Sequence, residues 1–211
     1  MELEFIQIQG QDGAGSWVPV VNQTLIHSTI NPTKEASLLL DKEWDSIKGA
    51  RSIIVFGLGG GFHIAELLKR GSFEVFVIEA EKKLISAMQL KWPELMAQIE
   101  VFADFPAHQL VGELNQLGAF SNTYAILKHP ASVRLNPIFY RSIQHILNDR
   151  TLHRLREMAS KNDRLSRFLD SLDINRDQIL TLPMVEEALV RRGTGLDREA
   201  LIWLALRELV V

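Results

Sequence analysis

Short apolar runs alternate with helix-like segments through the middle of this 211-residue chain. A run without polar interruptions is typical of a strand buried on both faces, and the segments between the runs have amphipathic helical patterns. We therefore expect an α/β fold with a parallel sheet covered by helices on both faces and joined by right-handed crossovers. The predicted strands are Ser52–Gly57, Phe73–Ala80, Gln98–Asp104 and Asn122–His129.

A different pattern precedes this core. Leu3–Gln9 partly alternates apolar and polar residues, and the following segments Trp17–Val21 and Thr24–Ser28 also resemble strands. We expect a small antiparallel β unit there, with Pro19 favouring an edge strand because proline donates no ladder hydrogen bond. A helix should follow over Asn31–Trp44, capped by Asn31 and with proline at its first position.

After His129 the sequence predicts helices only, apart from a possible short strand at Gln178–Leu182. The last helix is apolar nearly all round, so it should be buried against this chain, a second copy or another domain. The predicted regions are an N-terminal β unit and helix (1–46), a Rossmann-like core (47–148) and a C-terminal helical extension (149–211). The expected C-terminal helices are Asn136–Leu147, Asp149–Leu172, Pro183–Gly193 and Asp197–Val211.

Composition excludes several classes of function. The net charge of -3 argues against a nucleic-acid surface, and the absence of cysteine excludes disulfides and thiolate chemistry. The N-terminus lacks the pattern of a signal peptide, and the longest apolar stretch, Ala200–Leu206, is too short to span a membrane. We therefore expect a cytoplasmic protein without a membrane partner.

A glycine cluster follows the first predicted core strand. Gly57, Gly59 and Gly61 would let the chain turn sharply and approach a ligand closely. Glu79 ends the second strand, where a carboxylate can accept hydrogen bonds from ribose hydroxyls. Asp104 should lie on the same carboxyl edge of the sheet, where open parallel sheets bind ligands. Alternatively, the glycines only permit tight packing between strand and helix, and Asp104 is a solvated loop acid.

The spacing of the glycines distinguishes between types of nucleotide site. A Walker loop needs Gly-Lys-Ser/Thr and a dinucleotide fingerprint needs glycine at 62, but Phe62 follows Gly61. The G-x-G-x-G spacing resembles the first motif of Rossmann-like methyltransferases that bind S-adenosylmethionine. That resemblance implies that the three glycines line methionine and ribose, that Glu79 holds the ribose hydroxyls, and that Asp104 approaches the adenine. Phe56 departs from the family, which usually has an acid there.

The region from about residue 20 to 150 shows a second resemblance. The segment TLIHSTINPTKEASLLLDK, the glycine cluster, Glu79 and the KHPAS sequence are similar in order and spacing to the N-terminal Rossmann-like domain of bacterial motility accessory factors. This family is implicated in flagellin glycosylation, and archaeal pterin diphosphokinases are related to it. Its putative sugar-transfer chemistry is assigned to a further domain, whose glycine-proline-serine motif is absent here. The resemblance therefore implies no transferase activity for this chain.

The histidines give less guidance. His129 ends the fourth strand, where it could act as a general base, but a solvent-facing histidine beside a proline turn is the favoured interpretation. His27 and Ser28 suggest no catalytic triad because no acid is positioned to orient the histidine. The six histidines show no H-x-x-x-H pair, so we expect no metal site.

Two functions remain open. In the first, the chain binds S-adenosylmethionine or a related nucleoside or nucleotide, with or without methyl transfer. In the second, it is a non-catalytic Rossmann-like module of a flagellar or surface-glycosylation system that acts through binding or assembly. The C-terminal helices would then pair with a second copy or a partner domain.

Overall fold

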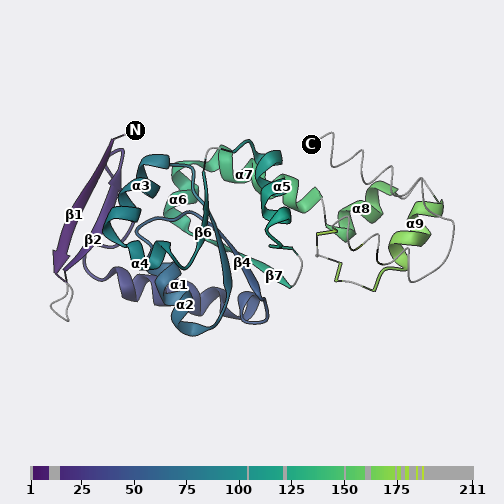
Figure 1. Cartoon of the computed structure of the whole chain (residues 1–211), viewed down its shortest axis with the longest axis horizontal. Coiled ribbons are helices and arrows are strands. Elements are labelled where there is room, and N and C mark those ends of the chain that lie inside the picture. The colour runs from purple at the N-terminus through teal and green to yellow at the C-terminus, as the bar shows by residue number, and fades with distance from the viewer. Residues whose placement is uncertain are drawn as a thin grey trace. The chain divides into compact units, whose positions relative to one another are not determined.

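The chain divides into two compact units in the computed structural model (Figure 1). The first comprises Met1–Phe105 and Asn122–Tyr140, and the second comprises Pro106–Ser121 and Arg141–Val211. The structure describes residues 2–9, 15–103, 105–120, 123–149, 151–159, 163–173, 175–176, 179–180, 184 and 187.

Four parallel strands form the core of the first unit, which confirms the predicted α/β fold with a parallel sheet (Figure 1). Their order is β6-β5-β4-β7, so the chain adds strands on one side of β4 and then crosses to its other side. In doubly wound folds this reversal creates a crevice at the carboxyl ends of the two strands, where ligands bind. The strands are β4 (Ser52–Phe56), β5 (Glu74–Ile78), β6 (Glu100–Phe102) and β7 (Tyr124–Lys128).

Alternate residues of these strands face the main hydrophobic core. Ile53 and Val55 of β4 pack there with side chains from three helices. One helix follows the N-terminal β unit, one follows β4 and one follows β5. The first two of these helices also pack against each other (Figure 1). The helices are α1 (Pro32–Ile47), α2 (Phe62–Arg70) and α3 (Lys82–Lys91), and a short α4 (Pro93–Met96) follows.

The opposite face of the sheet is also apolar. Phe56 is buried there and stacks on Tyr140 with ring centroids 5.6 Å apart. The Tyr140 hydroxyl lies 3.4 Å from the Ile78 carbonyl oxygen, to which it donates. Phe56 therefore has a packing role at the position where the methyltransferases usually carry an acid.

The predicted antiparallel unit is present and packs on the core of the first unit. It contains β1 (Leu3–Gln9), β2 (Gly15–Val21) and β3 (Thr24–Leu25), in that order. The expectation that Pro19 marks an edge strand was wrong, because β2 is central. Pro19 is tolerated there because β3 is so short that it pairs only with Val20 and Val21.

The helix after this unit begins as expected. The Asn31 side chain accepts a hydrogen bond from the Lys34 N–H at 2.8 Å, and Pro32 occupies the first helical turn. This cap satisfies one of the free N–H groups at the start of α1. The cap therefore fixes the residue at which α1 begins.

Helices follow β7 in the described residues, and the segment predicted as one helix, Asp149–Leu172, contains two shorter ones. The predicted C-terminal extension as a whole is not confirmed. The predicted helix after Asn136 is confirmed as α7, whereas the segments predicted at 183–193 and 197–211 lie outside the described residues except for Met184 and Glu187. No helix within the described ranges has the length and apolar character needed to cross a membrane. The remaining helices are α5 (Ala107–Gln116), α6 (Pro130–Leu135), α7 (Pro137–Asp149), α8 (Leu152–Ala159) and α9 (Asp163–Asp170).

Candidate functional site

The glycine turn, Gly57–Gly61, joins the carboxyl end of β4 to the start of α2. Gly57, Gly59 and Gly61 have φ angles of +99°, +51° and +77°, which residues with a Cβ atom rarely adopt. A Cβ atom on Gly59 would lie 2.7 Å from His27 Nε2, and one on Gly61 would lie 2.5 Å from Leu95 Cδ2. These glycines therefore do permit close packing, whether or not they also admit a ligand.

Glu79 follows β5 and lies against this turn. Its carboxyl oxygens accept hydrogen bonds from the Leu58 N–H at 2.7 Å and the Glu81 N–H at 2.9 Å. The side chain is only 2% exposed, and this burial raises the pKa of Glu79 to about 7 although the N–H donors oppose the change. The predicted acid and the predicted turn thus form one hydrogen-bonded unit.

Asp104, the remaining predicted site residue, lies outside the described residues. Its strand, β6, pairs with β5 in the parallel sheet and ends at Phe102. The Glu79 N–H donates to the Phe102 carbonyl oxygen at 2.9 Å, so Glu79 marks the carboxyl end of both strands. The assignment of Asp104 to the adenine remains a prediction.

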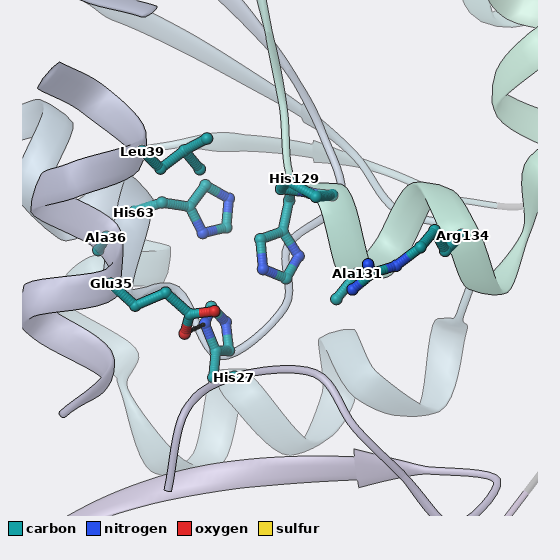
Figure 2. A pocket seen from close by; sticks show the side chains of 9 residues that line it. His27, Glu35, Ala36, Leu39, His63, His129, Ala131 and Arg134 are labelled. Carbon is teal, nitrogen blue, oxygen red and sulfur yellow. Dashed lines mark ion pairs between the residues drawn. The ribbon is translucent and has the colours of Figure 1, made fainter. Parts of the chain in front are cut away.

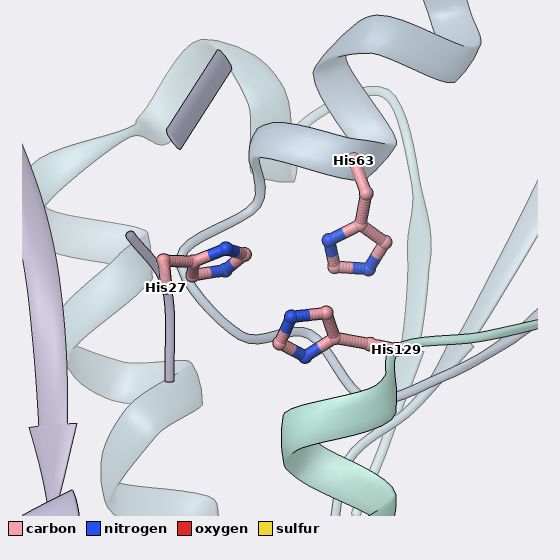
Figure 3. Close-up of side chains that lie close together, drawn as sticks. All are labelled: His27, His63 and His129. Carbon is pink, nitrogen blue, oxygen red and sulfur yellow. The ribbon is translucent and has the colours of Figure 1, made fainter. Parts of the chain in front are cut away.

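Three histidines from distant parts of the chain meet beside the glycine turn (Figure 3). His27 follows β3, His63 lies in the first turn of α2, and His129 joins β7 to α6. One ring nitrogen of each lies within 4.8 Å of the others, and all three side chains are buried. We call these residues the histidine cluster; it lies where β4 and β7 end, at the reversal of strand order.

Each ring is oriented by another group. His63 Nε2 lies 3.0 Å from the Gly57 carbonyl oxygen, which can only accept, so Nε2 carries the proton. The Gly60 N–H donates to His27 Nε2 at 2.8 Å, which leaves the proton of neutral His27 on Nδ1. His129 Nδ1 lies 2.8 Å from the Ser132 hydroxyl oxygen.

Burial keeps two of these rings in the neutral form. Desolvation lowers the pKa of His63 to about 3 and holds the pKa of His129 well below its ordinary value. The neighbouring rings act in the same direction, because positive charges this close would repel each other. A neutral imidazole has one nitrogen lone pair, which makes it a hydrogen-bond acceptor, a base or a metal ligand.

Glu35 of α1 completes one side of the cluster (Figure 2). Its Oε2 lies 3.5 Å from His27 Nδ1 and accepts a hydrogen bond from the Ser28 N–H at 2.7 Å. Interaction with the His27 side chain lowers the pKa of the Glu35 carboxyl group, and the Ser28 N–H adds to this effect. The ionised Glu35 carboxylate therefore faces the Nδ1 side of the His27 ring.

A cavity of about 90 Å³ opens beside the histidine cluster (Figure 2). All three histidines line it, with Glu35 and Arg134 supplying opposite charges. At about 30 Å³ per water molecule, the cavity holds a few waters, whereas drug-sized ligands occupy pockets of roughly 300–1,000 Å³. The cavity therefore suits an ion with its waters, or a small anion.

Two expectations about the histidines were wrong. His129 is 3% exposed and packs in the cluster, so it does not face solvent. His27 does have an acid beside it, because the capped start of α1 brings Glu35 to its ring.

His63 was missed as a candidate by the sequence reasoning. Its position straight after the glycine turn was the available signal, because this places it at the same sheet edge as His129. No sequence signal indicated that His27 would join them, since this depends on how the N-terminal β unit packs.

Comparison of the chain with models of protein families, with curated proteins and with solved structures found no match in any of the three. The resemblances to methyltransferases and to motility accessory factors therefore remain predictions from the motifs alone.

Proposed function

We propose that this chain binds an adenosyl ligand, S-adenosylmethionine or a related nucleoside, at the glycine turn. The observation that carries the proposal is the contact between Glu79 and the turn, in which the carboxyl group accepts the Leu58 N–H. The acid that would hold a ribose is thus next to the turn that would approach it, at the edge where parallel sheets bind ligands.

The hydrogen bonds of the turn favour a nucleoside over a dinucleotide. Pyrophosphates bind to free N–H groups at such turns. Here the N–H groups of Leu58, Gly60 and Gly61 already donate to Glu79, His27 and the Leu58 carbonyl oxygen. The adenosyl part of S-adenosylmethionine carries no phosphate, so it does not compete for these donors.

Glu79 retains the capacity to hold a ribose. The two carboxyl oxygens have four lone pairs in all, and the N–H groups of Leu58, Glu81 and Gly59 interact with them. The carboxyl group can therefore accept one further hydrogen bond, from a ribose hydroxyl. Because Glu79 is 2% exposed, neighbouring side chains must move aside before a ribose reaches it. Binding on this proposal includes a local opening of the structure.

The proposal concerns binding and assigns no methyl transfer. The described parallel sheet has four strands, whereas working methyltransferases usually extend it with three more. The alternative is a non-catalytic module of a flagellar or surface-glycosylation system, as the motility accessory factor motifs suggest. The two proposals differ in one measurable respect, because only the first requires an adenosyl ligand.

Thermal unfolding with a panel of ligands tests the proposal. S-adenosylmethionine or S-adenosylhomocysteine at 100 times its Kd should stabilise the chain by about 2.7 kcal/mol, whereas NAD and nucleotide sugars should not. Glu79→Ala should abolish the effect and Glu79→Gln, which keeps one acceptor oxygen, should weaken it. Glu100→Ala is the control, because Glu100 is exposed at the start of β6, at the other edge of the sheet. Absence of stabilisation by both adenosyl compounds would reject the proposal and leave the assembly alternative.

A further inference from the structure

We propose that His27, His63 and His129 form a transition-metal site with an open coordination position, and that zinc is the metal to test first. The inference goes beyond the proposed adenosyl site and does not depend on it. It rests on the convergence of three imidazoles, their orienting partners and the adjoining cavity.

The separation of the three rings is close to that of a metal site. Zinc binds histidine nitrogen at about 2.0–2.1 Å, so nitrogens in a tetrahedral site lie roughly 3.3 Å apart. The nitrogens of the cluster lie within 4.8 Å of one another. The rings of His63 and His129 are nearly parallel, at 6°, with centroids 4.6 Å apart. Binding of one ion therefore requires the rings to draw closer together and the stacked rings of His63 and His129 to reorient.

His63 provides the clearest indication of a role as a metal ligand. Its Nε2–H donates to the Gly57 carbonyl oxygen, so Nδ1 carries the lone pair. This Nδ1 atom is buried and has no hydrogen-bond partner among the described residues. A buried polar atom without a partner costs free energy, and a metal ion would remove that cost. The Nε2–H to carbonyl bond is also the usual outer contact of a metal-bound histidine.

The other two histidines also have the outer contacts of metal ligands. His27 Nδ1 faces the Glu35 carboxylate, the arrangement of a carboxylate–histidine–metal triad. Its Nε2 accepts the Gly60 N–H, so coordination through Nε2 exchanges this hydrogen bond for a metal bond. His129 Nδ1 contacts the Ser132 hydroxyl, which leaves Nε2 as the ligand when Nδ1 donates.

The chemistry of the donors restricts the metal. Imidazole suits zinc, copper, nickel and iron, whereas magnesium and calcium prefer oxygen ligands. Three protein ligands leave a tetrahedral metal one position for water or substrate, as in catalytic zinc sites. The cavity of about 90 Å³ has room for that ligand, and Arg134 on its wall favours an anionic one.

Zinc titration of the untagged 211-residue chain tests the inference. We expect one zinc ion per chain with a dissociation constant in the micromolar range or tighter. His27→Gln, His63→Gln and His129→Gln should each weaken binding by at least about 100-fold, which exceeds the usual effect of losing an outer contact. His145→Gln, at an exposed histidine outside the cluster, should bind as the wild type does. Ser132→Ala, which removes a positioning residue, should weaken binding about 10- to 100-fold.

A measurement on the wild type keeps the inference testable if a variant fails to fold. Cobalt(II) substituted for zinc should give the intense visible absorption of a four-coordinate site. The weak spectrum of a six-coordinate ion, or loss of affinity in His145→Gln equal to that in the cluster variants, would overturn the inference. Wild-type chain that binds zinc only at millimolar concentration would overturn it as well.

Discussion

Glu79 is a carboxyl group that the fold removes almost completely from water. Burial raises its pKa to about 7, although the Leu58 and Glu81 N–H groups donate to its oxygens. Burial makes the ionised form of Glu79 less stable, but the carboxyl group supplies the acceptor for the Leu58 N–H of the glycine turn. Groups with strongly shifted pKa values are common at functional sites. Here the group is Glu79, which connects the end of β5 to the glycine turn.

The stability of the chain should therefore depend on the protonation of Glu79. In the unfolded chain this carboxyl group loses its proton near pH 4.5, whereas in the folded chain it does so near pH 7. Between these values the folded state binds more protons, so its contribution to stability falls as the pH rises. Each pKa unit corresponds to about 1.4 kcal/mol, so the loss is at most roughly 3–4 kcal/mol.

Urea unfolding from pH 4.5 to 8 measures this effect. The free energy of unfolding of Glu79→Gln, relative to wild type, should rise with pH across this window, because glutamine does not ionise. Glu100→Gln should follow the wild-type curve, since Glu100 is exposed. Parallel curves for Glu79→Gln and wild type would show that Glu79 does not titrate as proposed.

At the scale of single elements, the glycine turn fixes where α2 begins. Gly57 has a φ of +99°, and its Cα approaches Ser132, which follows β7. The Gly57 N–H donates to the Ile78 carbonyl oxygen, which continues the ladder between β4 and β5. This one turn therefore holds two strands, α2 and the segment after β7 in fixed positions.

Gly57→Ala should destabilise the first unit by about 2–4 kcal/mol, because a Cβ atom meets both an unfavourable φ and the Ser132 side chain. Gly49→Ala is the matched control. No heavy atom lies within 4 Å of a Cβ atom at Gly49, so its effect should be below about 1 kcal/mol. Chemical denaturation of the two variants measures the difference. Equal stabilities would mean that the turn relaxes easily and is not the rigid element described here.

The sequence predicted these elements because they depend on local patterns. The uninterrupted apolar run Ile53–Phe56 indicates a buried strand by its composition alone. The helix start at Asn31-Pro32 is likewise local, because the Asn31 side chain caps the helix and Pro32 suits its first turn. The tolerance of Pro19 in the central strand β2 depends on the shortness of β3, which local patterns do not reveal. Glu79 was predicted beside the turn because parallel strands end at one edge.

On the scale of the whole molecule, the histidine cluster could not be predicted in the same way. His63 and His129 follow adjacent strands, so the sheet order alone brings them together. His27 reaches the histidine cluster because the N-terminal β unit packs on the first unit's core. Val21 and Ile26, which precede His27, are buried in that main hydrophobic core. Such contacts between distant segments leave no periodic signal in one sequence.

The proposed adenosyl ligand would bind at the carboxyl edge of the parallel sheet. Backbone amide NMR of the ¹⁵N-labelled full chain, titrated with S-adenosylhomocysteine, tests this claim most directly. We expect saturable shifts of the amides close to the site, with little change at the Glu74 and Glu100 amides on the opposite edge. The amides close to the site are those of Leu58, Gly60, Glu79 and Glu81. An unchanged spectrum at millimolar ligand, or shifts confined to residues away from the turn, would contradict it.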